Sequence, residues 1–221
     1  MTEREFELSH KSLCLESTPL KMLDCFCGMG GVSDGFALEG FDVTGIDIVD
    51  APKMLGYKHK FIQADMATLK GEDFRGYDVI WGSPPCTDFS TASCPNKTRK
   101  GRKAPDPEIG LELIRAFRKF VDDANPKFWL MENVPRTTKF YIVEKPILYF
   151  WTSKYAKRAL WGNVAFPLMS EFHSSRVLEK DYAKLKWCEQ SALKAKIPLA
   201  CSRAFAKTCK DALLNPIEVG V

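Results

Sequence analysis

Short apolar runs separated by turn residues recur along the first 135 residues of the chain. They occupy residues 22–26, 43–46, 61–62, 79–81 and 128–131. Runs of this length between turn signals are typical of buried strands in a parallel sheet. Between the last two, residues 107–125 carry apolar side chains at helical spacing, with Pro107 suited to the first turn and Asn125-Pro126 to the end. Strands alternating with helices predict a doubly wound α/β domain with a mostly parallel sheet.

The rest of the chain extends this pattern. Residues 145–153 and 157–166 are expected to complete the sheet, and a helix is expected after Ile197-Pro198. Residues 1–19 are polar and end in Ser-Thr-Pro, which predicts an N-terminal tail. We therefore expect one domain over residues 20–221.

Polar or reactive residues follow each of the five predicted strands. The first run continues into "DCFCGMGG", and the next four are expected to end at Asp47, Asp65, Cys86 and Glu132. In doubly wound sheets, ligands bind at the carboxyl ends of the strands. A single acidic residue there has an ordinary explanation, because strand ends tolerate acids. Five such residues at one edge favour a ligand site.

The glycines of "GMGG", residues 28–31, lie between a predicted strand and a predicted helix. Such a turn lets the backbone approach a ligand closely, although alone it fits a tight strand–helix connection equally well. It is not the G-x-G-x-x-G of dinucleotide enzymes, which disfavours an oxidoreductase. Asp47, about 20 residues further on, could bind ribose hydroxyls. Asp65 could then accept from the amine of adenine, so the three features together favour an adenosine-containing ligand.

Cys86 follows two prolines in "GSPPCTDFS", and its thiol either fills a turn or acts as a nucleophile. Thiolate attack needs a partly exposed, electropositive setting. A basic run that follows could supply it or clamp a phosphate backbone, and equally could be a solvated loop: Lys97, Arg99, Lys100, Arg102 and Lys103. Glu132 ends a strongly apolar strand, so its pKa should rise enough for proton donation near neutrality. A nucleophilic thiol beside a protonated acid suits addition to C6 of cytosine, with the acid at N3.

Composition narrows the function classes only modestly. The 221 residues carry a net charge of +4, which is compatible with a nucleic-acid partner without requiring one. No run of 18 apolar residues and no secretory signal is present, so we expect no membrane association and a cytoplasmic location. The eight cysteines show no CxxC pairs and no zinc-site spacing, so we expect reduced thiols and no metal.

These motifs together resemble those of the S-adenosylmethionine-dependent DNA cytosine-5 methyltransferases. "DCFCGMGGVSDGF" is similar to the first motif of that family, "GSPPCTDFS" to its Pro-Cys motif and "MENV" to its Glu-Asn-Val motif, in the family order over residues 21–135. The resemblance implies a Rossmann-like class I methyltransferase fold, S-adenosylmethionine as methyl donor, and double-stranded DNA as the favoured substrate. It also implies that the target cytosine is flipped out of the duplex.

The resemblance assigns roles residue by residue. It implies three catalytic residues, Cys86, Glu132 and Arg158. The cofactor-binding residues would be Asp24, Phe26, Gly28, Gly30, Asp47, Ile48, Asp65 and Pro84. The substrate-binding residues would be Pro85, Asn133, Lys97, Arg99 and Arg102.

The chain also departs from the family pattern. Thr87 stands where the Pro-Cys motif usually continues with Gln. The family's Gln-x-Arg-x-Arg motif has only "SKYAKRALWGN" as a counterpart, which supplies Arg158 and, less securely, Lys157. Only residues 136–221 follow Pro135, so the target-recognition region, about 136–195, is expected to be reduced or absent. A protein partner could then supply specificity.

Two alternative functions follow from these observations. The chain could be an RNA-directed relative of the tRNA-modifying type, or a non-catalytic subunit that keeps the methyl-donor fold. In addition, a cluster of aromatic residues could stack on nucleic acid, although core packing is expected for most of them. They are Phe140, Tyr141, Tyr149, Phe150, Trp151, Tyr155 and Trp161.

Overall fold

The computed structural model describes residues 18–89, 105–153, 156–164 and 195–215. Their elements follow an alternating order of strands and helices. In chain order these are β1 Lys21–Cys25, α2 Gly31–Leu38, β2 Asp42–Asp47, α3 Ala51–Leu55, β3 Lys60–Gln63, the 3-10 helices η1 Met66–Thr68 and η2 Gly71–Phe74, β4 Val79–Gly82, α4 Pro107–Ala124, β5 Phe128–Asn133, η4 Pro135–Lys139, β6 Leu148–Ser153, β7 Ala156–Gly162 and α6 Leu199–Leu214.

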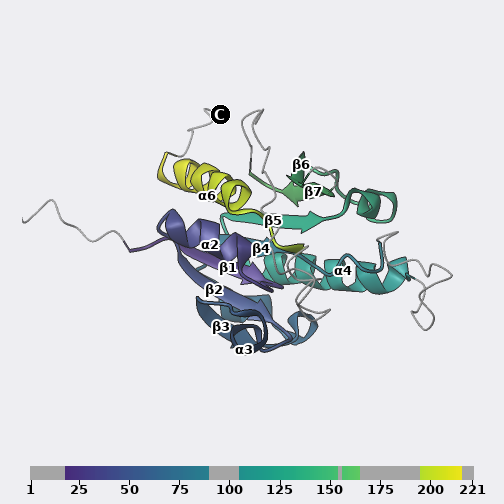
Figure 1. Cartoon of the computed structure of the whole chain (residues 1–221), viewed down its shortest axis with the longest axis horizontal. Coiled ribbons are helices and arrows are strands. Elements are labelled where there is room, and N and C mark those ends of the chain that lie inside the picture. Colours follow the sequence, from purple (N-terminus) through teal and green to yellow (C-terminus); the bar gives the residue numbers. More distant parts are fainter. Residues whose placement is uncertain (1–17, 90–104, 154–155, 165–194, 216–221) are drawn as a thin grey trace, which may run out of the picture.

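The seven strands form one sheet in the order β3-β2-β1-β4-β5-β7-β6. Strands β1 to β5 pair in parallel, whereas β7 is antiparallel to both of its neighbours, β5 and β6. The sheet is thus mostly parallel, and the predicted doubly wound α/β fold is confirmed (Figure 1). Because β7 runs in the opposite direction, its first residues lie at the edge where the parallel strands end.

The sequence located two strand ends too late. β3 ends at Gln63, since Asp65 instead caps η1 by accepting a hydrogen bond from the Ala67 amide. β4 ends at Gly82, four residues before Cys86. Pro84 and Pro85 lack the N–H group that a ladder hydrogen bond requires, so the strand cannot continue through them. The predicted helix, the last two strands and the C-terminal helix are confirmed.

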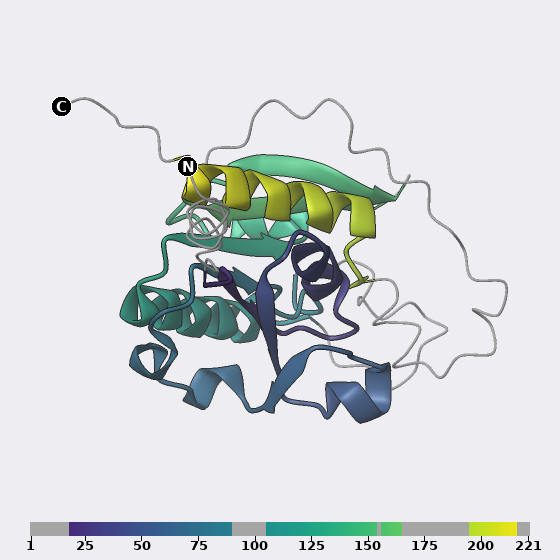
Figure 2. The ribbon, with the colours of Figure 1, turned by 90° about the vertical axis from the view of Figure 1, so that its left-hand side faces the viewer.

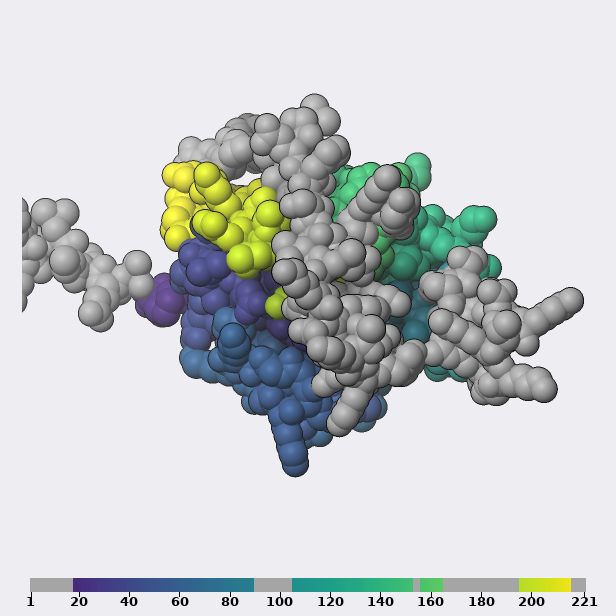
Figure 3. Space-filling model, in the orientation of Figure 1, coloured from purple at the N-terminus to yellow at the C-terminus, as the bar shows by residue number. Residues whose placement is uncertain are grey.

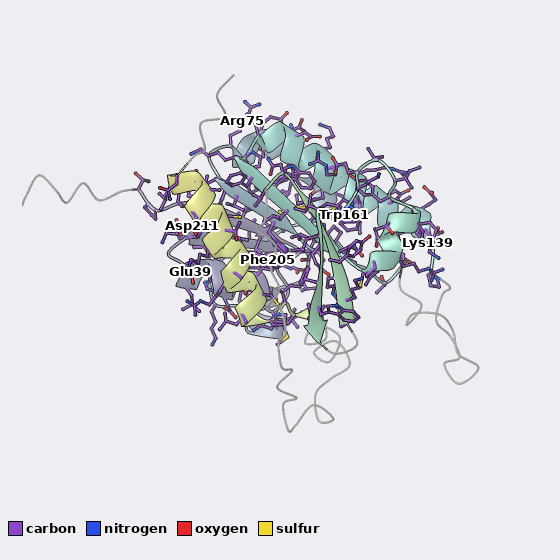
Figure 4. The ribbon with its side chains drawn as sticks, turned by 90° about the horizontal axis from the view of Figure 1, so that it is seen from above. Glu39, Arg75, Lys139, Trp161, Phe205 and Asp211 are labelled. Atoms are coloured by element: carbon purple, nitrogen blue, oxygen red, sulfur yellow. The ribbon has the colours of Figure 1, made fainter. Side chains whose placement is uncertain are left out.

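Helices cover both faces of the sheet. On one face α2 and α6 share a core with β1, β4 and β5, in which Phe205 packs against Trp81 and Phe150. On the other face α4 packs Ile114, Phe117 and other apolar residues against the same strands. Figures 1 and 2 show α6 and α4 on opposite sides of the strands, and Figure 4 looks down on α6 with Phe205 labelled.

The aromatic cluster divides into two groups. Tyr141, Phe150 and Trp161 are buried, which confirms the expected core packing for them, and Phe140 packs partly buried against the α4 core. Tyr149 and Trp151 are instead 44% exposed on β6. Tyr155 lies outside the described residues. In the part of the chain that the structure describes, none of the helices combines the length and apolar character needed to cross a membrane.

The contact between α2 and α6 depends on a glycine. Figure 3 shows the yellow atoms of α6 lying against the blue-violet atoms of α2. A Cβ at Gly35 would overlap the Ser202 side chain and lie 2.6 Å from the Arg203 backbone nitrogen. Backbone atoms cannot move aside as a flexible side chain can, so any larger residue at this position must separate the two helices.

We therefore expect Gly35→Ala to lower the free energy of unfolding by about 1–3 kcal/mol, through overpacking. Urea unfolding followed by circular dichroism measures this change. The control is Leu38→Ala in the same helix, because Leu38 is exposed and its truncation should change stability by about 0.5 kcal/mol or less. A stabilised Gly35→Ala variant, as helix propensity alone predicts, would contradict the close contact.

Candidate functional site

The turn after β1 has an unusual backbone. Gly28 and Gly30 have φ angles of 50° and 73°, and Phe26 has a φ of 63°. Glycine adopts this left-handed region at no steric cost, whereas a side chain such as that of Phe26 is strained there. Nothing lies within 4 Å of the position that a Cβ would take at Gly28. The turn is therefore held in a strained conformation with open space over Gly28.

Asp47 fixes this turn from the end of β2. Its Oδ2 accepts a 2.9 Å hydrogen bond from the Gly28 amide, and its Oδ1 accepts one of 3.2 Å from the Val49 amide. Next to it, Ile48 is 63% exposed, and its carbonyl accepts from the Gln63 side chain at the end of β3. Gly28, Asp47 and Ile48 are thus brought together, while Asp65 is exposed at the start of η1.

Asp24 supports the turn from inside the protein. It is 1% exposed, and its Oδ2 accepts from the Ser33 amide at 3.2 Å and the Ser33 hydroxyl at 2.6 Å. Burial raises the pKa of Asp24 to about 7, although the Ser33 hydrogen bonds act in the opposite direction. The Ser33 hydroxyl also lies 2.9 Å from that of Tyr57. Asp24 therefore ties the first turn of α2 to β1, and its contact with the cofactor stays a prediction of the resemblance.

Tyr57 is a residue that the sequence did not identify. Its ring would lie 3.0 Å from a Cβ at Gly30, and its hydroxyl would overlap a Cβ at Gly45. Gly30 therefore needs its small size as well as its positive φ. No local pattern around Tyr57 indicates this contact, because its partners come from β2 and the turn before α2.

The segment carrying Cys86 is held between β1 and β5. The Ser83 amide donates to the Cys25 carbonyl at 3.1 Å, and the buried Pro84 offers its carbonyl to Asn133 Nδ2 at 3.1 Å. Asn133 is 1% exposed, and its Oδ1 accepts from the Val134 amide and the Thr137 hydroxyl. Its amide is thus engaged inside the protein and holds the Pro-Cys segment, while its contact with the substrate stays a prediction.

Glu132 and Arg158 form a buried ion pair across β5 and β7. Arg158 Nε lies 2.8 Å from Glu132 Oε1, with side-chain exposures of 13% and 9%. Burial raises the pKa of Glu132 to about 7, which confirms the expected rise, while Arg158 and a hydrogen bond from Ser83 oppose it. Trp81 Nε1 donates to Ser83 Oγ at 2.8 Å, so the hydroxyl proton of Ser83 is free to point to Glu132. The sequence analysis assigned no role to Ser83 or Trp81, although Ser83 lies within the quoted Pro-Cys motif and Trp81 directly precedes it.

Cys86 lies within the electrostatic influence of this pair. Burial is the main cause that raises the pKa of the Cys86 thiol, the Glu132 carboxylate raises it further, and Arg158 lowers it. The thiol is thus more strongly protonated than a free cysteine at neutral pH. Pro85 is exposed beside it. Lys97, Arg99 and Arg102, which were expected to make this setting electropositive, lie outside the described residues.

Two buried carboxyl groups therefore make stability depend on pH. Asp24 and Glu132 both have a pKa of about 7, raised from below 5. Between those values the folded protein keeps protons that the unfolded chain has released, so the free energy of unfolding should fall as pH rises from about 4.5 to 7. The fall is on the order of 1.4 kcal/mol per pH unit for each group.

Glu132→Gln should reduce this fall, because glutamine cannot ionise. Urea unfolding at pH 5 and pH 7.5 compares the variant with the wild type. Glu112→Gln, on the exposed side of α4, is the matched control and should keep the wild-type dependence. Wild-type stability that rises across this interval would show that the two groups ionise normally.

Comparison with known proteins gives the site a context. The family model "C-5 cytosine-specific DNA methylase" matches residues 20–143, more than half of the chain. The Type II methyltransferase M.HindV of Haemophilus influenzae is 31% identical, over 59% of this chain and 43% of its own length. The "Probable DNA (cytosine-5)-methyltransferase" of Frog virus 3 is 30% identical, over 65% of this chain and 66% of its own length.

Among solved structures, Dnmt2 methyltransferase of S. pombe is 17% identical with a TM-score of 0.46, covering 65% of this chain and 48% of its own. The chain spans less than half of the length of several type II methyltransferases that it matches, with shares of 43%, 34% and 33%. The family match nevertheless includes the glycine turn, the Pro-Cys segment and Glu132-Asn133. The chain belongs to the C-5 cytosine-specific DNA methylase family.

Proposed function

We propose that this protein transfers a methyl group from S-adenosylmethionine to C5 of cytosine in DNA, through a covalent bond between Cys86 and C6 of the base. The observation that carries this proposal is the cluster of Cys86, Glu132 and Arg158 at the carboxyl edge of the sheet, beside the open glycine turn. A nucleophile, an acid with a pKa of about 7 and a cation that orients the acid are the groups that the addition requires.

The residues at the ends of β1, β2 and β3 fit the methyl donor. The open space at Gly28 admits a ligand against the backbone, and the exposed Ile48 offers an apolar surface for an adenine ring. Asp47 would hold the ribose hydroxyls with lone pairs that its two backbone hydrogen bonds leave available. Asp65 would accept from the adenine amine, and Phe26 and Gly30 would line the methionine part. When bound, S-adenosylmethionine supplies the electrophilic methyl group.

Cys86 and Glu132 act on different atoms of the base. Cys86 Sγ loses its proton and bonds to C6 of a cytosine that has left the stack, while Glu132 donates a proton or hydrogen bond to N3. Electron density then accumulates at C5, the atom to be methylated. After methylation, loss of the C5 proton to a base breaks the bond between Sγ and C6 and releases the thiol. Pro85 would lie beside the base, and Asn133 would act by positioning the Pro-Cys segment.

The pKa of Glu132 suits both halves of this cycle. Because burial raises it to about 7, the protonated form that N3 requires is available at neutral pH. Because Arg158 and Ser83 stabilise the carboxylate, the proton can also be given up without a large cost. Arg158 is thus assigned mainly to the ionisation and orientation of Glu132.

Trapping on a fluorinated base tests the chemistry. A fluorine at C5 cannot leave as the proton does, so the protein should remain bound covalently to 5-fluorocytosine DNA when the methyl donor is present. Cys86→Ser should abolish the adduct, because a hydroxyl is a far poorer nucleophile at neutral pH. Glu132→Gln should slow its formation by about 10²- to 10⁴-fold. Denaturing gels of the wild type and variants measure the adduct.

Cys201→Ala is the control for this experiment, since Cys201 is buried in the α2–α6 core and should not affect trapping. An adduct that persists in Cys86→Ser would identify another nucleophile. Parallel reactions with fluorinated DNA and RNA separate the proposed substrate from an RNA target, and no adduct on either would contradict cytosine-5 methylation.

The cofactor assignment has its own test at Ile48. Because Ile48 is 63% exposed, Ile48→Ala should leave the melting temperature of the free protein unchanged while weakening S-adenosylmethionine binding about three- to tenfold, through lost apolar contact. Titration calorimetry measures the affinity. Met54→Ala, at an exposed apolar residue of α3, should bind like the wild type. Equal affinity in Ile48→Ala and the wild type would exclude Ile48 from the adenine site.

A further inference from the structure

The edge strand β6 presents a row of apolar side chains to solvent. Tyr149 and Trp151 lie at alternate positions of the strand, in step with Ile147 directly before it, and the exposed fractions of Ile147, Tyr149 and Trp151 are 43%, 44% and 44%. Phe150, between the two aromatics, points to the opposite face and is buried. Period-two alternation of a strand normally gives buried apolar and exposed polar residues. Here both faces carry apolar residues, and among the residues that the structure describes the outer ones stay more than two-fifths exposed.

Lys157 makes this row a charged surface. Trp151 is paired with Lys157 on β7, and the Lys157 Nζ lies 4.8 Å from the centroid of the Tyr149 ring and 5.8 Å from that of Trp151. The exposed ammonium group of Lys157 therefore lies close to both exposed aromatic rings. We name Tyr149, Trp151 and Lys157 the β6–β7 platform.

The sequence around the platform has a strong positive excess. Residues 136–157 contain five Lys or Arg and one acidic residue, Glu144; Arg158 is left out because it pairs with Glu132. Glu144 is itself paired with Arg118, so it does not offset the nearby exposed Lys139 and Lys145. Cations among exposed aromatic rings are the combination by which proteins bind single-stranded nucleic acid, since the rings stack on bases and the cations attract phosphates. An uncharged protein partner would make no favourable electrostatic contact with these lysines, so the charge favours nucleic acid.

The platform lies at the same edge of the sheet as the candidate site. Lys157 precedes Arg158 on β7, so the two side chains point to opposite faces of the sheet at its carboxyl edge. β6 lies two strand spacings from β5, or roughly 10 Å, which about three nucleotides span at a rise of 3.4 Å each. A strand passing over this edge could place one base at Glu132 and neighbouring bases on the platform.

We infer that the β6–β7 platform binds unpaired nucleotides that flank the target base, by stacking on Tyr149 and Trp151 and by a phosphate contact from Lys157. The inference rests on the proposed function for its location beside the target base. Paired bases inside a duplex do not offer their faces to these rings, so the platform favours single-stranded or locally opened nucleic acid. It gives this chain a means of holding substrate with the described core alone.

The test uses the full chain and a short fluorescein-labelled oligo(dT), with binding measured by fluorescence anisotropy. Tyr149→Leu and Trp151→Leu keep apolar bulk but remove the rings, and each should weaken binding about tenfold, the loss expected for one stacked base. Lys157→Gln should reduce the slope of log affinity against log salt by about 0.7. Leu38→Ala, an exposed apolar residue of α2, is the matched control and should bind like the wild type.

Three outcomes would overturn the inference. The first is that the wild type fails to bind oligo(dT). The second is that both leucine variants bind oligo(dT) as tightly as the wild type. The third is that light scattering shows a dimer for the wild type and monomers for the leucine variants, which would make the platform a self-association surface. Unchanged binding of a dA·dT duplex by the leucine variants would support it. Because oligo(dT) contains no cytosine, this result is independent of trapping on 5-fluorocytosine.

Discussion

The ion pair between Glu132 and Arg158 is the interaction on which the candidate site depends. Two charges taken out of water cost more than their attraction returns unless geometry and further hydrogen bonds are favourable. Here the 2.8 Å contact is supplemented by Ser83, itself held by Trp81. The pair exists because β7 runs antiparallel to β5, which brings the beginning of one strand to the end of the other. Sheet topology thus contributes to the ionisation of Glu132, the acid whose charge acts on the Cys86 thiol.

A second buried acid, Asp24, holds the glycine turn after β1 at the same edge of the sheet. Asp24 and Glu132 are the penultimate residues of β1 and β5, the two strands that flank β4, and burial raises the pKa of each to about 7. The two carboxyl groups have different partners, and therefore different roles. Asp24 accepts hydrogen bonds from the amide and hydroxyl of Ser33, so its role is to tie the first turn of α2 to β1. Glu132 has a cation and a hydroxyl donor, so it can change its ionisation at less cost.

The elements and motif residues could be predicted because their signals are local. The apolar runs locate β1 to β5 within a few residues, and the helical spacing with Pro107 and Asn125 locates α4 almost to the residue. Glu132 and Cys86 are identified by motif, and the raised pKa of Glu132 follows from its apolar strand. The site nevertheless needed partners that no local pattern reveals. Tyr57 under Gly30 and Ser83 under Glu132 are ordinary residues in sequence, and only the packing of distant segments gives them a function.

The same limit applies to Asn133 and to the aromatic cluster. The motif places an asparagine after Glu132, but only its burial and its hydrogen bond to the Pro84 carbonyl show that it holds the Pro-Cys segment.

For the aromatic residues, strand alternation predicts that neighbours along β6 face opposite sides of the sheet, but not whether both sides are covered. That depends on where the sheet ends. Because β6 is an edge strand, α4 and η4 leave its outer residues exposed, and an edge with exposed apolar residues is a liability unless something binds there. The lysine between the two rings keeps this edge charged, which opposes strand pairing and favours a negatively charged partner.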